Sequence, residues 1–195
     1  MTSLEFWLQK PVSDAIGRLR DRKIAIDVGA NAGSWTLPLS ESFDTVIAAE
    51  PDERVSFDVP ENATLLRVVV CGHTGEETLH LRSTTGHNSI LEKHPIGGDG
   101  MADVPVVESR VLPCVTLDDL SSDGADFVKI DVEGGECEVL SGCRDIEKWE
   151  RTVFLVECHD TFNDVLRELI RLGKSVTMIP HPLHAHPGHC WAIGE

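Results

Sequence analysis

The sequence lacks long apolar runs and closely spaced cysteine pairs. No stretch among its 195 residues approaches 18 consecutive apolar residues, so we expect no membrane-spanning segment and no membrane partner. The N-terminal stretch MTSLEFWLQKPVSD has no basic flank followed by an apolar segment, and it does not match a signal peptide. The six cysteines form no CxxC pair, and most lie within apolar runs. This pattern indicates reduced core thiols in a cytoplasmic protein.

Positive charge is also scarce. The chain has 17 Lys and Arg against 33 Asp and Glu, which gives a formal net charge of −16. Such a surface repels phosphate backbones, so nucleic acid is not expected as a partner. The apolar share of 41% is ordinary for a globular protein, and the length suits one domain with a sizeable core.

Several short apolar runs are rich in β-branched residues and are typical of strands buried on both faces of a parallel sheet. Helical patterns separate several of them, which predicts a doubly wound α/β sheet. The clearest helix covers Thr161–Leu172, where Thr161 and Asp164 fit a capping box and Gly173 ends the pattern. The predicted strands are KIAIDV (23–28), TVIAAE (45–50), TLLRVVV (64–70), DFVKIDV (126–132) and TVFLVE (152–157).

The N-terminal segment differs from this alternating pattern. Apolar residues at helical spacing predict a helix over residues 3–20 that is broken or kinked near Pro11. We therefore divide the chain into an N-terminal helical segment, residues 1–22, and a single domain, residues 23–195. Phe6 and Trp7 on this helix would pack on the core or on a second copy in a homo-oligomer.

Two further strand patterns follow the third predicted strand and indicate a β insertion. They are EETLHLRS (76–83) and VVESRVLPCVTL (106–117), joined by a long glycine-rich segment, residues 84–105. A loop of that length in a compact domain is usually functional or disordered. The C-terminal stretches SVTMIPHP (175–182) and HCWAIGE (189–195) predict two closing strands, the last one in a hairpin.

The stretch KIAIDVGANAGSWT, residues 23–36, predicts a strand that turns into a helix next to a small-molecule ligand. Gly29 and Gly33 permit tight curvature and a close ligand, and Asn31 tolerates left-handed geometry. In an open α/β sheet such a ligand lies outside the carboxyl ends of the strands. A plain strand-to-helix connection is the alternative.

The flanking residues narrow down the ligand. The dinucleotide motif G-x-G-x-x-G is incomplete, because Ser34 stands where its third glycine would be. Glu50, at the tip of the next strand, is placed to accept hydrogen bonds from both hydroxyls of a ribose. Asp27 adds negative charge that suits a cationic amino-acid end better than a phosphate. These features favour S-adenosylmethionine over a nicotinamide dinucleotide, and so a methyltransferase over a nicotinamide-dependent oxidoreductase. A non-catalytic S-adenosylmethionine-binding module is a third alternative.

A second group of polar residues follows the strand in VKIDVEGGECEVL, residues 128–140. Asp131, at the strand end, would hold the amino group of the methionine or orient the acceptor. Glu133 would act as a base or bind a metal with Asp131, while helix capping is the plainer role of Glu133 and Glu136. His159, expected at a strand tip and not in the core, and a loop histidine are the other candidate bases.

Metal binding is the less favoured interpretation of these residues. Two carboxylates are too few for a dedicated magnesium site, so we predict no metal in the catalytic group. The tract HPLHAHPGHC, residues 181–190, has nitrogen and sulfur ligands, but its spacing matches no tetrahedral zinc motif. A loop at the rim of the acceptor site is the favoured role of this tract.

These motifs, in their order and spacing, resemble the FkbM family of S-adenosylmethionine-dependent methyltransferases. The resemblance implies a Rossmann-like seven-stranded sheet with its last strand antiparallel, and O-methylation of a hydroxyl on a sugar or small natural product. It also implies that Asn88 and Ser89 reach the cofactor. His73 departs from the family, which often has Asp near that turn. The matching stretches are DVGANAGSWT (27–36), EP (50–51), VVVCGHTGEETLHL (68–81), VTLDDL (115–120), VKIDVEGGECEVLSG (128–142) and VECH (156–159).

Overall fold

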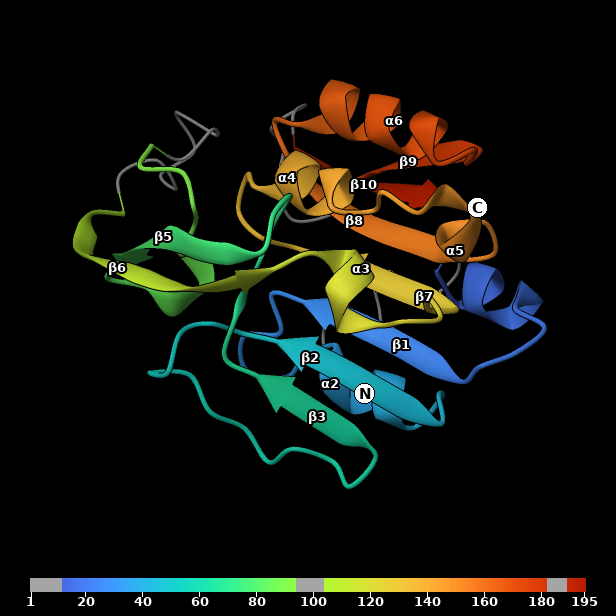
Figure 1. Cartoon of the computed structure of the whole chain (residues 1–195), viewed down its shortest axis with the longest axis horizontal. Helices are drawn as coiled ribbons and strands as arrows, with labels where there is room; N and C mark the ends of the chain where they lie inside the picture. The colour runs from blue at the N-terminus through green and yellow to red at the C-terminus, as the bar shows by residue number, and fades with distance from the viewer. Residues whose placement is uncertain (1–11, 94–103, 182–188) are drawn as a thin grey trace.

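The computed structural model describes residues 12–93, 104–181 and 189–195, and within them it contains an α/β fold built on a seven-stranded sheet (Figure 1). The strand order is β3-β2-β1-β7-β8-β10-β9. Each predicted strand of the parallel pattern contributes to this sheet. The strands are β1 (Ile24–Val28), β2 (Thr45–Ala49), β3 (Ala63–Leu66), β7 (Phe127–Ile130), β8 (Val153–His159), β9 (Val176–Pro180) and β10 (His189–Gly194).

The direction of the strands confirms the predicted fold class. Neighbouring strands from β3 to β8 pair in parallel, whereas β10 pairs antiparallel with both β8 and β9. The order changes direction at β1, because β2 lies on one side of it and β7 on the other. Ligands of open α/β sheets bind at such a switch point.

Helices cover both faces of the sheet, and alternate residues of each strand enter two separate cores. In β1, Ala25 packs with residues 12–18 and α2, whereas Ile26 packs with α3 to α6. In β7, Phe127 belongs to the same core as Ala25, and Val128 belongs to the same core as Ile26. The helices are α2 (Thr36–Ser40), α3 (Leu117–Leu120), α4 (Glu136–Ser141), α5 (Ile146–Trp149) and α6 (Phe162–Arg171).

The predicted β insertion forms a second sheet of order β4-β6-β5, located beyond the carboxyl ends of the main strands (Figure 1). Its strands are β4 (Val69–Val70), β5 (Gly75–Arg82) and β6 (Val106–Val115), and the short 3-10 helix η1 (Thr85–His87) follows β5. The prediction of one continuous strand over residues 64–70 was wrong. The chain leaves the main sheet after Leu66 and pairs with β6 from Val69 onward.

The helix predicted after the glycine turn is present as α2, which begins at Thr36 after turns over residues 31–35. The capping box predicted for α6 needs correction. Thr161 precedes α6 but makes no capping bond, because its hydroxyl donates to Glu136 Oε2 at 2.7 Å instead. Asp164 pairs with Arg167, so the capping box is absent, while Gly173 ends the helix with a φ of +76° as predicted.

The described part of the N-terminal segment packs on the main domain. Residues 12–18 are helical, and the side chains of Val12 and Ala15 are buried against the sheet. The expected break at Pro11, together with Phe6 and Trp7, lies outside the described residues. Among the described residues, no helix is both long and apolar enough to cross a membrane.

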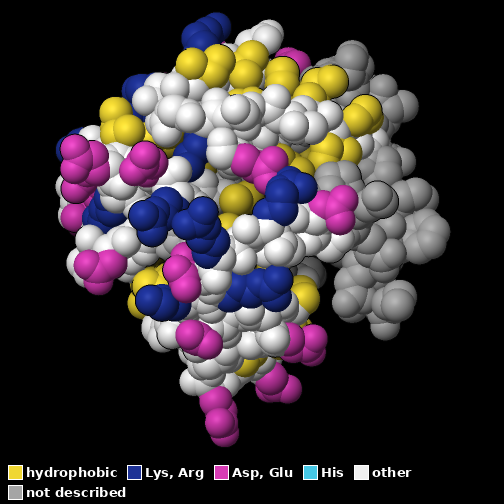
Figure 2. Space-filling model, turned by 90° about the vertical axis from the view of Figure 1, so that its right-hand side faces the viewer, with side chains coloured by type: hydrophobic (Ala, Val, Ile, Leu, Met, Phe, Trp, Pro, Cys, Tyr) yellow, Lys and Arg dark blue, Asp and Glu magenta, His cyan; other side chains and the backbone are white. Residues whose placement is uncertain are grey.

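The face at the amino ends of the strands carries mixed charge (Figure 2). Lys and Arg side chains gather across it with Asp and Glu between them, and Arg18 pairs with Glu195 near the C-terminus. A shallow depression there is lined by Arg18, Arg20, Asp21 and Arg151 among others. The candidate site lies at the opposite ends of the strands.

Candidate active site

A pocket opens at the carboxyl ends of β1, β2 and β7, where the small sheet closes its other side. One wall comes from the loops after the main strands and includes Gly29, Asn31 and Glu50. The opposite wall is mainly apolar and includes Val69, Leu79 and Ile90. Of the residues predicted to bind the cofactor, Gly29, Asn31, Glu50, Ser89 and Asp131 line this pocket, as do Glu133 and Asn88.

The loop after β1 runs against the loop after β7 with no room for a side chain. Gly29 has a φ of +76°, and a Cβ atom there would lie 1.9 Å from the carbonyl oxygen of Asp131. Gly33 has a φ of +78° and packs against the ring of Phe57, outside the pocket lining. Gly29 therefore lets two loops of the site meet, whereas Gly33 shapes the turn from behind.

We expect Gly29→Ala to destabilise the fold as well as impair ligand binding. Left-handed geometry alone costs a non-glycine residue about 1–3 kcal/mol, and the contact with Asp131 adds to it. Even a small side chain must therefore displace one of the two loops. Denaturant unfolding of Gly29→Ala and of the control Gly17→Ala, where a Cβ meets nothing within 4 Å, measures the difference. Equal stability of the two variants would contradict the close packing described here.

Glu50 is fixed at the tip of β2 by backbone donors. Its Oε2 accepts from the Asn31 amide at 2.9 Å, and its Oε1 accepts from the Asp52 amide at 2.8 Å. Asn31 makes this contact from left-handed geometry, with a φ of 43°. Burial raises the pKa of Glu50, while the two amide bonds oppose that rise. The carboxylate is thus held in one orientation on the pocket wall.

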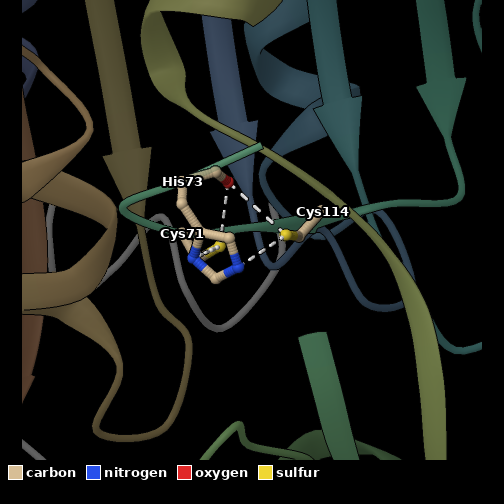
Figure 3. A group of neighbouring side chains, drawn as sticks. All are labelled: Cys71, His73 and Cys114. Carbon is tan, nitrogen blue, oxygen red and sulfur yellow. Dashed lines mark hydrogen bonds between the residues drawn. The ribbon is translucent and has the colours of Figure 1, made fainter. Parts of the chain in front are cut away.

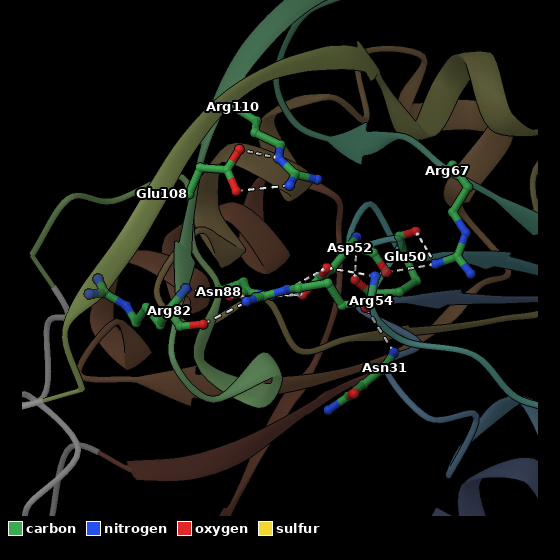
Figure 4. A network of polar contacts seen from close by, with 9 residues as sticks. All are labelled: Asn31, Glu50, Asp52, Arg54, Arg67, Arg82, Asn88, Glu108 and Arg110. Carbon is green, nitrogen blue, oxygen red and sulfur yellow. Dashed lines mark hydrogen bonds and ion pairs between the residues drawn. The ribbon is translucent and has the colours of Figure 1, made fainter.

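A partly buried network of polar side chains ties the Glu50 loop to the small sheet (Figure 4). Arg54 pairs with Asp52, whose Oδ2 also accepts from Asn88 Nδ2 at 2.7 Å. Asn88 Oδ1 accepts from the Arg82 amide at 2.8 Å. Arg67 donates to the carbonyl oxygens of Glu50 and Asp52. Asn88 therefore holds the pocket wall together, and its polar groups are already engaged.

Beneath the pocket floor, Asp27 and Lys129 form a buried ion pair. They are register partners in β1 and β7, and Lys129 Nζ lies 3.2 Å from Asp27 Oδ1. Thr36 donates to Asp27 Oδ2 at 2.6 Å, and Lys129 also donates to the Gly29 carbonyl at 2.7 Å. Burial would lower the pKa of Lys129, but Asp27 and Asp131 outweigh it and raise this pKa. Asp27 is fully buried and does not line the pocket.

The loop after β7 brings Asp131 and Glu133 to the pocket. Glu133 has a φ of 56°, and Gly134 follows with a φ of 102°. Such strain in a non-glycine residue often marks a functional site. Ser89 donates from its buried hydroxyl to the Glu133 carbonyl at 2.8 Å and so supports this backbone. His87 Nδ1, from the loop after β5, lies 3.7 Å from Glu133 Oε2.

His159 stands at the centre of the acidic group, at the end of β8. Its place at a strand tip was predicted correctly, but the expectation that it lies outside the core was wrong, because only 1% of its surface is accessible. Its Nδ1 lies 2.9 Å from Glu136 Oε1, and its Nε2 lies 3.5 Å from Glu133 Oε2 and 4.0 Å from Asp131 Oδ1. Burial would lower the pKa of His159, but Glu136 and the other carboxylates raise it to about 10.

This pKa predicts how stability depends on pH. Because the folded-state pKa lies above the ordinary value of 6.5, the imidazolium stabilises the fold fully below about pH 6.5. That contribution falls as pH rises and is lost through about pH 10. The gap in unfolding free energy between wild type and His159→Gln should therefore narrow from about pH 6 to pH 10. A ring that titrates near its ordinary pKa in an NMR experiment would contradict this.

Next to His159, Glu157 accepts from two further histidines. Glu157 Oε1 lies 2.7 Å from His189 Nε2 and 3.3 Å from His181 Nε2. Burial would raise the pKa of Glu157, but the two histidines and His159 lower it. The remaining histidines of the tract 181–190 lie outside the described residues. The two ends of this tract that the structure describes, His181 and His189, therefore lie at the same edge of the site as Asp131 and Glu133.

The charges at this edge favour a cationic ligand. Carboxylates of Asp131, Glu133 and Glu157 gather there, and burial and Glu157 raise the pKa of Asp131 against the effect of Lys129. Among the described residues that line the pocket, none is Lys or Arg. A bound ammonium or sulfonium group would relieve this repulsion, whereas a pyrophosphate would add to it.

The sequence analysis did not identify the residues that hold these site residues in place. It did not identify Lys129, the Asp52–Arg54–Asn88 network, or Glu157 with its histidines. For Lys129 there was a signal, because a lysine inside the apolar run FVKI, opposite Asp27 on an adjacent strand, indicates a buried ion pair. Glu136 was assigned to capping, and it does accept from the Gly134 amide at 2.8 Å. Its bonds to His159 and Thr161 were not foreseen.

The seven-stranded sheet, in which only β10 runs antiparallel to its neighbours, is a Rossmann-like fold. A model of the methyltransferase FkbM domain matches residues 27–176, so the chain belongs to the FkbM methyltransferase family. A comparison with curated proteins finds no match.

Solved structures share the fold at low sequence identity. The FkbM methyltransferase of Methylobacillus flagellatus KT superimposes with a TM-score of 0.59 and 15% identity, over 92% of this chain and 45% of that one. This chain thus spans less than half of that relative. An rRNA methylase from Streptococcus thermophilus superimposes with a TM-score of 0.51 and 11% identity, over 94% of this chain and 93% of that one. SMU.1697c from Streptococcus mutans, in complex with SAH, superimposes with a TM-score of 0.50 and 14% identity, over 96% of this chain and 98% of that one.

Proposed function

We propose that this protein uses S-adenosylmethionine to methylate a hydroxyl group of a sugar or another small molecule. The observation that carries the proposal is the pocket itself, which joins a fixed carboxylate, Glu50, to an acidic edge at Asp131 and Glu133. Such a pocket fits a ligand with a ribose at one end and a cationic amino acid at the other. SAH, present in the Streptococcus mutans neighbour, is the demethylated form of such a ligand.

The residues present fit this cofactor. Glu50 would hold the ribose hydroxyls, the apolar side chains of the small sheet would cover the base, and Asp131 would bind the ammonium group. When bound, the cofactor supplies an electrophilic methyl group. Asp27 is paired with Lys129 beneath the pocket, whereas Asp131 lines it, so Asp131 rather than Asp27 is the carboxylate that would meet the ammonium group.

Glu133 is the residue best placed to take a proton from the acceptor. It lines the pocket, and its carboxylate lies 3.5 Å from His159. With a pKa of about 10, His159 is protonated at neutral pH and has no lone pair to accept a proton. We therefore assign His159 as a positioning residue that orients Glu133, and Glu133 as the base. The hydroxyl acceptor itself would enter beside Glu157 and His181.

The proposal is tested by incubating the purified chain with S-adenosylmethionine and a panel of sugars and small hydroxylated metabolites. Mass spectrometry should find one acceptor that gains a single methyl group, with SAH formed in equal amount. Binding of the cofactor with no product from any acceptor would favour a non-catalytic binding module. Binding of NAD instead would favour the oxidoreductase.

Replacing Glu50 should weaken cofactor binding. If its carboxylate accepts from the ribose hydroxyls, Glu50→Ala removes charge-assisted bonds of about 1.5–3 kcal/mol, and affinity falls by about one to two orders of magnitude. Glu50→Gln should be milder. Calorimetry measures affinity, and unfolding measurements separate this effect from loosening of the Asn31 and Asp52 loops. An unchanged dissociation constant in Glu50→Ala would place the ribose elsewhere.

A further inference from the structure

Cys71, His73 and Cys114 form a group of metal-ligand type outside the pocket (Figure 3). Cys71 follows β4, His73 lies in the turn to β5, and Cys114 belongs to β6. Both cysteines are buried, whereas His73 is exposed. The proposed methyl transfer uses none of the three. We propose that they bind a zinc ion that fastens the small sheet.

The distance from Cys71 to His73 already suits a tetrahedral ion. Cys71 Sγ lies 3.5 Å from His73 Nδ1, the nitrogen that would bind the ion, whereas Cys114 Sγ lies 3.5 Å from the other ring nitrogen, Nε2, and would have to move toward Nδ1. Zinc bonds of about 2.3 Å to sulfur and about 2.0–2.1 Å to nitrogen imply a sulfur–nitrogen edge of about 3.6 Å. One ligand atom from each residue lies within 4.8 Å of the others, so small side-chain rotations bring three ligands to one ion.

Hydrogen bonds already orient the three side chains. Both thiols point at the carbonyl oxygen of His73, at 3.3 Å from Cys71 Sγ and 3.4 Å from Cys114 Sγ. His73 Nε2 lies 3.3 Å from the carbonyl oxygen of Glu76. Metal-binding histidines usually donate their second ring N–H to such an acceptor. With Nε2–H donated there, the Nδ1 lone pair is available to the ion.

Charge and access are also suitable. On binding, each thiol releases its proton to solvent, and two thiolates then neutralise the two positive charges of zinc within a buried site. Three protein ligands leave a fourth position, which opens toward solvent because His73 is exposed. Water would occupy that position.

The ion would stabilise the side of the pocket formed by the small sheet. Cys71 and Cys114 pack with Val69, Leu79 and Leu81 in one small core. Val69 and Leu79 also line the pocket. A bond between β6 and the turn after β4 would hold the strands of this wall to one another. Zinc is thus assigned a structural role that does not depend on the identity of the methyl donor.

The test is a zinc titration of the reduced, metal-free full chain, without any methyl donor, against a competing chromophoric chelator. We expect one tightly bound zinc per chain and a higher melting temperature when zinc is added. His73→Ala, on the exposed side, should weaken binding by more than about tenfold. Cys71→Ser combined with Cys114→Ser should abolish it. His80→Ala and Cys137→Ser are the matched controls and should bind zinc as wild type does.

Cobalt distinguishes this site from the carboxylate and histidine groups around His159. Co²⁺ bound by the wild-type chain should show sulfur-to-cobalt charge-transfer absorption, which the double cysteine variant lacks. Zinc binding that survives in that variant, or cobalt binding without the charge-transfer band, would overturn the proposal. A reduced chain that binds no zinc, or that only forms a Cys71–Cys114 disulfide on oxidation, would overturn it as well.

Discussion

Lys129→Met should lower the free energy of unfolding by about 3–5 kcal/mol, because it leaves the carboxylate of Asp27 buried without its partner. Asp27 and Lys129 are both almost fully buried, and the pair lies directly below the loop that forms the pocket floor. The variant also removes the donor to the Gly29 carbonyl. Urea unfolding measures the loss.

Two controls isolate the ion pair. Asp27→Leu combined with Lys129→Met removes both charges, and much of the stability should return. Lys174→Met replaces another buried lysine, which donates to the Glu150 carbonyl and whose pKa is lowered by burial to about 8. It leaves no buried carboxylate unpaired, so we expect a loss of about 1 kcal/mol. Losses of equal size in Lys129→Met and Lys174→Met would contradict the account of the ion pair.

Glu133→Gln should slow the methyl transfer step by about 100-fold or more while leaving cofactor affinity unchanged. The amide keeps the shape of the side chain but does not accept the proton of the acceptor. Asp131→Asn should damage both binding and turnover, because in the proposed binding mode Asp131 holds the cationic end of the ligand. Single-turnover kinetics and calorimetry separate the two effects.

A neighbouring carboxylate outside the pocket lining provides the control. Glu138→Gln, on α4, removes the charge of a carboxylate that does not line the pocket, so it should leave both quantities unchanged. Removal of hard divalent cations should also leave the rate of the wild-type enzyme unchanged. Activity that is lost with chelator and restored by magnesium, manganese or calcium would assign Asp131 and Glu133 to metal binding instead.

The sequence was sufficient to predict the sheet because burial on both faces leaves a direct pattern. Strands such as FVKI are apolar at nearly every position, and the β-branched runs end where the loops of the site begin. Glycines at 29 and 33 likewise marked a turn that only left-handed geometry allows. The position of Glu50 followed from the rule that parallel strands end at the same edge.

Long-range pairing left no comparable pattern. The strand over 64–70 was predicted as one element because apolar character does not show that Arg67 turns back to bind the Glu50 loop. The Thr161 hydroxyl could accept from a backbone N–H of its own helix or donate to a carboxylate, and its bond to Glu136 depends on a residue 25 positions away. The raised pKa of His159 arises from three carboxylates that come together only in the folded chain.

Calorimetric titration of the wild-type chain with S-adenosylmethionine, and separately with NAD, tests the central claim most directly. The account predicts one S-adenosylmethionine per chain, no measurable binding of NAD, and an affinity for S-adenosylmethionine that falls by about one to two orders of magnitude in Glu50→Ala. Binding of NAD, or binding of S-adenosylmethionine that is unaffected by both Glu50→Ala and Asp131→Asn, would contradict it.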